Sequence, residues 1–163
     1  MTTTLIVILI TILLAMVFLP FSRALIKDRA ELHENPMEKK FDILITHIND
    51  LLMDGMGEVV KFRNDPRMLN LFDENLPNMI INFYYSTGTL TVKLNYKYFN
   101  AELVRKMQFH NMRQADTFRQ LDAANQFCEE AAAAIRVHRR EFDQSMEARI
   151  CRDKQSTTGH TEI

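Results

Sequence analysis

The stretch that decides the fold is "MIINFYYSTGTLTVKLNYKYF", which runs from Met79 to Phe99. After its glycine, apolar and polar residues alternate strictly, which is the pattern of a strand buried on one side only. The same alternation precedes Ser86-Thr87-Gly88, a short connection that contains glycine. The stretch therefore predicts a β-hairpin over 79–98 in an antiparallel sheet, with one apolar face and one wet face.

A strong helix signal precedes the hairpin in "NPMEKKFDILITHINDLLMDGMG", residues 35–57. Asn35 suits the N-cap, Pro36 the first helical position, and Glu38 the third position of a capping box. Apolar residues then recur at i, i+3, i+4 and i+7, and Gly55 suits the position after the helix. We expect an amphipathic helix that packs on the sheet.

The segments between this helix and the hairpin are less regular. "EVVKF", residues 58–62, is short and β-branched, so it predicts a strand. "RNDPRMLNLFDENLPN", residues 63–78, carries Asn-Asp-Pro and Leu-Pro turn signals around an apolar cluster. We expect turn chemistry for its acidic residues and a helical turn that covers one edge of the sheet.

After the hairpin, Asn100 suits the N-cap of a predicted helix over 101–112. A last long helix is predicted from about residue 114 to Ala148. From Leu121 its apolar positions advance by three and four residues, which is a heptad seam. The seam is expected to pack on the sheet or on the first helix. The alternative is that its far end docks a partner or self-associates through Ile135, His138 and Phe142.

The N-terminal stretch "TTTLIVILITILLAMVFLPFSR", from Thr2 to Arg23, is the strongest hydropathy signal. No charge occurs before Arg23, and Pro20 falls near the end of the apolar run. A helix of about 20 residues spans roughly 30 Å, the thickness of one hydrocarbon core. The stretch therefore predicts a transmembrane helix, with the lipid bilayer as a partner.

The charges around this span distinguish an anchor from a signal peptide and indicate its orientation. No basic residue precedes it, whereas Arg23, Lys27 and Arg29 follow it. By the positive-inside rule these membrane-flanking residues predict a retained, single-pass signal-anchor with the N-terminus outside and the domain in the cytoplasm. The alternatives are cleavage after Ala24, which would release the domain or leave it outside, and a buried core helix.

The fold class that follows is α+β, with a single transmembrane helix before a small domain. An amphipathic helix and a long C-terminal helix pack on its short antiparallel sheet. The predicted organisation is an anchor over 1–22, a juxtamembrane helical segment over 23–35, a soluble domain over 36–148 and a disordered tail over 149–163.

Two groups of polar residues raise the question of a ligand. A ligand-stacking platform would use Tyr84, Tyr96 and Tyr98, but no basic patch accompanies them, so packing in the core and at the sheet rim is favoured. A ligand set on the first helix would use His47, Asp50 and Asp54, and a solvated face is favoured there. The cysteines, Cys128 and Cys151, do not have metal-site spacing. We interpret them as a core residue and a near-surface thiol, with a disulfide as the alternative.

The composition and the absence of common catalytic motifs limit the classes of function that we expect. The chain carries 20 basic and 21 acidic side chains, so it lacks the basic excess of nucleic-acid-binding proteins. It contains no phosphate-binding, zinc-protease or nucleophile-elbow motif, so we expect neither an enzyme nor a bound cofactor or metal. We expect a membrane-anchored protein-interaction or scaffold subunit at the cytoplasmic surface. The alternative is a ligand-binding or sensor domain outside the membrane.

Overall fold

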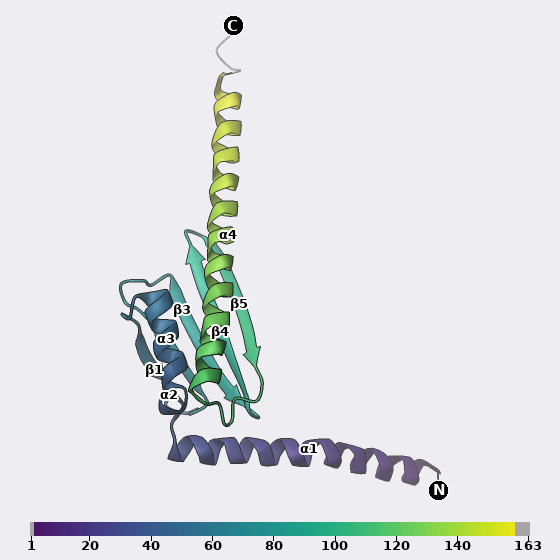
Figure 1. Ribbon diagram of the computed structural model, residues 1–163. Helices are drawn as coiled ribbons and strands as arrows, with labels where there is room; N and C mark the ends of the chain where they lie inside the picture. The colour runs from purple at the N-terminus through teal and green to yellow at the C-terminus, as the bar shows by residue number, and fades with distance from the viewer. Residues whose placement is uncertain (1, 159–163) are drawn as a thin grey trace.

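The computed structural model describes residues 2–158, and the surroundings of side chains over 9–149. A long N-terminal helix lies at one end of a five-stranded sheet, and a second long helix runs over the sheet (Figure 1). The α+β class is confirmed. The helices are α1 Thr2–Glu34, α2 Met37–Lys40, α3 Asp42–Met53 and α4 Thr117–Thr158, and the strands are β1 Glu58–Lys61, β2 Met68–Phe72, β3 Met79–Ser86, β4 Thr89–Tyr98 and β5 Ala101–Phe109.

The sheet is an antiparallel meander in the order β1-β2-β3-β4-β5. The predicted hairpin is present, with Ser86 opposite Thr89. Thr87 and Gly88 form its turn with φ values of 53° and 77°. Two positive φ values suit the tight turn that best matches the twist of paired strands. Buried side chains alternate with less buried ones along β3 and β4, so the prediction of one covered and one wet face is confirmed.

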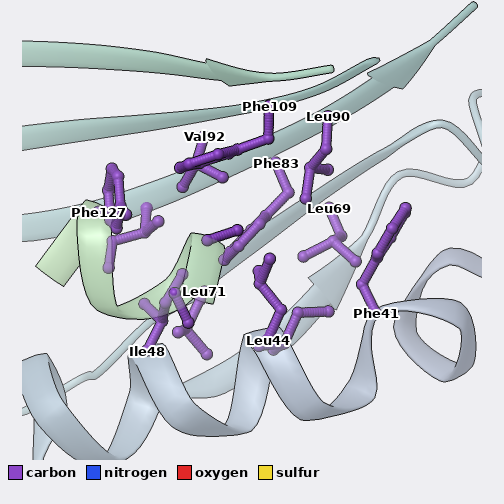
Figure 2. Close-up of a cluster of buried hydrophobic side chains, with 14 of the residues drawn as sticks. Phe41, Leu44, Ile48, Leu69, Leu71, Phe83, Leu90, Val92, Phe109 and Phe127 are labelled. Carbon is purple, nitrogen blue, oxygen red and sulfur yellow. The ribbon is translucent and has the colours of Figure 1, made fainter. Parts of the chain in front are cut away.

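The core lies between the covered face of the sheet and the two helices α3 and α4. Phe41, Leu44 and Ile48 point from the helical side toward the sheet, and Phe127 approaches from α4 (Figure 2). Phe83 and Val92 meet them from the central strands. All these side chains are at most 1% exposed, so the apolar alternation of the hairpin and the helical periodicity of α3 are satisfied by the same core.

The predicted capping box at Asn35 is wrong. The backbone N–H of Asn35 donates to the carbonyl of Glu31, so this residue still belongs to the end of α1. Pro36 takes the N-cap position of α2 without a side-chain hydrogen bond. The helix is also interrupted at Phe41, whose ring is fully buried and lies 5.4 Å from that of Tyr85.

The helical turn expected within 63–78 is instead strand β2, which pairs with both β1 and β3. Leu69 and Leu71 are buried, and their neighbours along the strand are partly exposed. The expected turn chemistry lies on either side of it. Asp65 and Asp73 each accept a hydrogen bond from the backbone N–H two residues later, which is the usual Asx-turn contact.

The helix predicted over 101–112 is also wrong, because Ala101–Phe109 forms β5. Phe99 and Asn100 reverse the chain, and β5 then pairs with β4 along its whole length. The free edge of β4 offers a full set of backbone partners at this point. That tertiary pairing outweighs the helical propensity of "AELVRKMQ". Phe99 has a φ of 51° in this turn, which is a strained value for a bulky residue.

Helix α4 follows the predicted heptad seam in its middle but differs at both ends. Ala124, Cys128 and Ala131 are buried as expected. Phe118, placed by the sequence among the apolar positions, is 80% exposed. The buried residue at that end is Gln120, whose side-chain amide donates to the carbonyls of Lys40 and Ala115. The helix continues to Thr158, through most of the predicted disordered tail, and residues 159–163 lie outside the described residues.

Gly57 connects α3 to β1 at a place where no side chain fits. A Cβ atom there would lie 2.5 Å from Oδ1 of Asn49 and 2.7 Å from Sδ of Met53. The same Asn49 oxygen accepts the Gly57 N–H at 2.8 Å. Packing against α3 therefore explains the glycine at position 57.

Gly57→Ala is expected to lower the free energy of unfolding by about 1–3 kcal/mol, because the added methyl group displaces Asn49 and Met53. Chemical denaturation of the full chain in detergent micelles measures this change. Met56→Ala, at the exposed neighbouring residue, is the control and should stay within about 0.5 kcal/mol of the parent. Equal stabilities of the two variants would contradict this role of Gly57.

Candidate interaction surfaces

The end of α1 is built into the domain through a buried carboxylate. Asp28 is 0% exposed, although it lies on the helix that carries the apolar stretch. It accepts a hydrogen bond from the backbone N–H of Thr87 in the hairpin turn and forms an ion pair with Arg113. Leu32, one helical turn further, is also buried. The last turns of α1 are thereby fixed to the turn between β3 and β4 and to the segment before α4.

A second ion pair strengthens this junction. Lys40 pairs with Glu31 of α1, and its Nζ donates to the carbonyl of Arg113 at 2.6 Å. The same Nζ lies 5.3 Å from the ring centre of Tyr85. Burial raises the pKa of that Tyr85 phenol. Three segments that are far apart in sequence therefore meet through charged groups that are largely shielded from water.

Because of this junction, α1 and the domain form one body. Helix α1 is continuous through Pro20 and the Ser22-Arg23-Ala24 segment. In Figure 1 it runs across the lower end of the domain, transverse to α4. The predicted flanking residues Arg23, Lys27 and Arg29 are all exposed on it.

One apolar helix, near the N-terminus, is long enough to cross a membrane in the part of the chain described. Its candidate span is Leu9–Glu34, with a mean hydropathy of 2.2 in the most apolar window, none of which is buried within this chain. A secretory signal sequence would meet the same criteria of length and hydropathy. The helix is therefore a candidate membrane span.

The predicted docking residues of α4 contact the chain's own sheet. Ile135 packs against the core. His138 donates from Nε2 to the carbonyl of Ala101 at 3.3 Å, and Phe142 lies 5.4 Å from the ring of Tyr98. All three are partly exposed. They are the contacts that hold α4 where it leaves the sheet.

Beyond these contacts α4 projects from the domain (Figure 1). The ring of Phe99 stacks on Phe142 at 5.3 Å with an interplanar angle of 8°. Arg139 donates to the hydroxyl of Tyr96 at 2.6 Å. From residue 143 to 149 every side chain is exposed. An aromatic cluster therefore anchors the base of the projecting helix.

The uncovered face of the sheet combines a row of amides with lysines. The side chain of Asn82 donates to Asn70 at 2.5 Å and accepts from Asn95, which links three adjacent strands. Beside this row, Lys93 of β4 lies directly opposite Lys106 of β5. Among the described residues neither lysine forms an ion pair. We call this surface the open face.

On the opposite side of the molecule, α3 and α4 form an outer helical face. A hollow of about 300 Å³ lies between them, lined by Leu51, Leu52, Cys128, Glu129, Ala132 and Arg136. Exposed carboxylates on these two helices, or directly after α3, include Asp42, Asp50, Asp54 and Glu129, of which Glu129 lines the hollow. In the described part of the chain none of these four has an ion-pair partner.

Several of the polar groups considered as ligand sites make contacts within the chain, whereas Asp50 and Asp54 are exposed. His47 donates from Nε2 to Oδ1 of Asn125 across the α3–α4 contact at 2.8 Å. No group of three potential metal ligands occurs among the described residues. Tyr84 lies 5.6 Å below the guanidinium of Arg67, which also pairs with Asp65 and lowers the pKa of that carboxyl. Tyr96 is buried, as the interpretation of core packing expects.

Cys128 is a free, buried thiol, as predicted, and burial raises its pKa to about 12. Cys151 lies on the same helix, 23 residues away, which corresponds to roughly 35 Å along the axis. A disulfide requires Cα atoms within about 7 Å. The alternative of a disulfide between these two cysteines of one chain is therefore wrong.

Cys128 is expected to resist alkylation in the folded protein, because its thiol is both shielded and protonated at pH 8. In a Cys151→Ser variant it remains as a single thiol, so labelling with a thiol reagent reports on it alone. We expect complete labelling in denaturant and at least about tenfold slower labelling without it. Equal rates in the two conditions would contradict the burial of Cys128.

Comparison with known proteins provides no functional assignment, since no protein-family model, curated protein or solved structure matches this chain.

Proposed function

We propose that the chain is a single-pass, membrane-anchored and non-catalytic assembly subunit whose domain acts at the cytoplasmic surface of the membrane. The observation that carries this proposal is the buried contact of Asp28 with Thr87 and Arg113. A flexible tether would leave the domain free to move relative to the span. A junction fixed by a buried ion pair instead gives the domain a set orientation, as an assembly subunit needs.

The side of the membrane follows from the basic residues on α1. Arg23 and Lys27 are exposed between the apolar turns and the buried junction, and Arg29 is exposed beside Asp28 on the junction itself. In that position they are available to lipid headgroups, and the positive-inside rule assigns them to the cytoplasm. The threonines at the start of α1 carry no competing charge. The proposed topology therefore has the N-terminus outside and the domain inside.

With α1 across the bilayer, its transverse arrangement sets how the domain presents its surfaces. The sheet and α4 then extend along the membrane surface rather than away from it (Figure 1). Neither the open face nor the outer helical face is turned directly toward the lipid. Both surfaces remain free for lateral contacts with proteins at the same membrane, which supports an assembly role.

Reporter fusions at the C-terminus test the topology. One reporter is active only in the cytoplasm and the other only outside. We expect a signal from the cytoplasmic fusion alone, with the mature protein retaining Met1 or Thr2 on N-terminal sequencing. A signal only outside, or an N-terminus just after Ala24, would overturn the proposal in favour of an exported ligand-binding or sensor domain.

Purification from detergent extracts tests the assembly role. We expect the tagged full-length chain to recover either a stoichiometric partner or a self-oligomer. The test variant is Asp28→Ala, which breaks the junction and should lose most of the recovered assembly. Glu34→Ala, at an exposed position of the same helix, is the matched control and should keep it. A clean monomer from the parent chain at cellular concentration would contradict an assembly role.

A further inference from the structure

We propose that the open face of the sheet docks onto the outer helical face of a second copy, so that chains form a head-to-tail row along the membrane. This inference deepens the proposed function and rests on it, since it names the partner of the assembly subunit. Within residues 9–149, the open face carries lysines without an ion-pair partner, and the outer helical face carries carboxylates without one. The two faces belong to the same chain, so one copy offers both halves of the contact.

An acidic partner would stabilise the two lysines of the open face. Lys93 and Lys106 are directly opposite each other on neighbouring strands. Like charges in such cross-strand positions destabilise a sheet. Within the part of the chain described, no carboxylate approaches either of them closely enough to form an ion pair. A carboxylate supplied by another molecule would relieve this repulsion.

The outer helical face offers carboxylates that point away from the chain's own core. Asp50 follows the buried Ile48 by two residues, which is about half a helical turn. Glu129 stands two residues from both Phe127 and Ala131, each of them buried. Both carboxylates are therefore directed outward, one from α3 and one from α4, and Glu129 lines the hollow between the two helices.

Apolar groups accompany the charges on both faces. On the open face, Ile80 is 38% exposed and Val104 is 51% exposed. They line the same hollow of about 240 Å³. On the helical face, the exposed Leu51 lines the hollow beside Glu129. Charged side chains line the same hollows, Lys97 and Glu102 on the open face and Glu129 and Arg136 on the helical face. A contact between the two faces therefore buries apolar area next to charged groups of both signs.

The position of α1 makes this contact compatible with one membrane. The helical layer lies over one face of the sheet, and α1 extends sideways from the domain rather than out of either face (Figure 1). A second copy stacked face to face can therefore keep its α1 parallel to that of the first. All the spans then enter the bilayer from the same side.

The contact joins two different surfaces and leaves one of each free at the ends. Such heterologous contacts repeat, giving open rows when the rotation between copies does not close a ring. The charge pairs lie at exposed positions, so they steer association and weaken as salt is added. The expected assembly is therefore concentration-dependent and salt-sensitive.

Charge reversal tests the proposal on the full-length chain in detergent micelles, with sedimentation as the readout. One variant carries Lys93→Glu and Lys106→Glu, and the other carries Asp50→Lys and Glu129→Lys. At low ionic strength we expect the parent to grow in mass with concentration. Each variant alone should associate at least about tenfold more weakly than the parent. An equimolar mixture of the two variants should regain association, because their altered faces are again complementary.

The control carries Arg63→Glu and Arg149→Glu, which makes the same change in net charge as the open-face variant but away from both faces. It should associate as the parent does. A control as weak as the open-face variant, or a mixture that stays monomeric while both variants keep the parent's melting temperature, would overturn the row.

Failure of this inference is distinguishable from failure of the proposed function. A parent chain that is monomeric at every concentration overturns the row. If that chain still recovers a different stoichiometric partner from cells, the proposed function stands. An N-terminus just after Ala24 overturns the proposed function, whatever the sedimentation shows.

Discussion

Asp28→Ala is expected to lower the free energy of unfolding by about 3–5 kcal/mol, because it removes the buried partner of an ion pair and leaves Arg113 with only its longer contact to Glu31. The carboxylate has no exposed surface, and it serves both the Thr87 N–H and the Arg113 guanidinium. Its loss also leaves a backbone donor of the hairpin turn without its partner, which adds to the effect.

Thermal and chemical unfolding of the full chain in detergent micelles measure this change. Glu34→Ala is the matched control, since it removes an acidic side chain from the same helix at an exposed position. It should stay within about 0.5 kcal/mol of the parent. Limited proteolysis gives a second readout, with cleavage between residues 24 and 36 accelerated only in Asp28→Ala. Unchanged cleavage and stability would contradict the fixed junction.

Phe127→Ala is expected to be similarly severe, with a loss of about 3–5 kcal/mol, because it leaves a cavity between α4 and the sheet. The ring is 1% exposed, and it faces the central strands in Figure 2. Small residues surround it on its own helix, notably Ala123, Ala124 and Ala131, so the surroundings have few long side chains with which to fill the space.

Phe118→Ala makes the same chemical change on the same helix and is the matched control. This ring is 80% exposed, so the expected change is below about 0.5 kcal/mol. Chemical denaturation of the two variants side by side distinguishes the two positions. Similar losses would mean that α4 packs with Phe118 toward the sheet, as the sequence pattern first indicated.

The sequence predicts the parts of the fold in which local pattern and burial coincide. The hairpin over 79–98 is an example, since its alternation and its turn residues both indicate the same register. The prediction of a helix over 101–112 was wrong because pairing with β4 outweighs the local helical propensity. A single sequence does not show that β4 has an edge free for this pairing. Strand β2 was missed because turn signals on both sides obscured a short alternation.

The interaction surfaces, like the fold, could be predicted from the sequence only in part. The apolar stretch and its flanking charges can be found by counting residues. The junction depends on Asp28 and Arg113, which are 85 residues apart, so their pairing belongs to the tertiary fold. A helical signal was nevertheless present, because Asp28 precedes the buried Leu32 by four residues and therefore shares its side of the helix. The pairing of Lys93 with Lys106 could not be predicted while β5 was expected to be a helix.

The fixed junction has a mechanical consequence. A rigid joint makes α1 and α4 the two arms of a lever, and α4, with 42 residues, is about 60 Å long. Transmembrane helices tilt by about 20° on average and adjust that tilt to bilayer thickness. A tilt change of that size in the plane of both arms would swing the far end of α4 by roughly 20 Å toward or away from the lipid. In the proposed topology, bilayer thickness would thus set the height at which the distal end of α4 meets its surroundings.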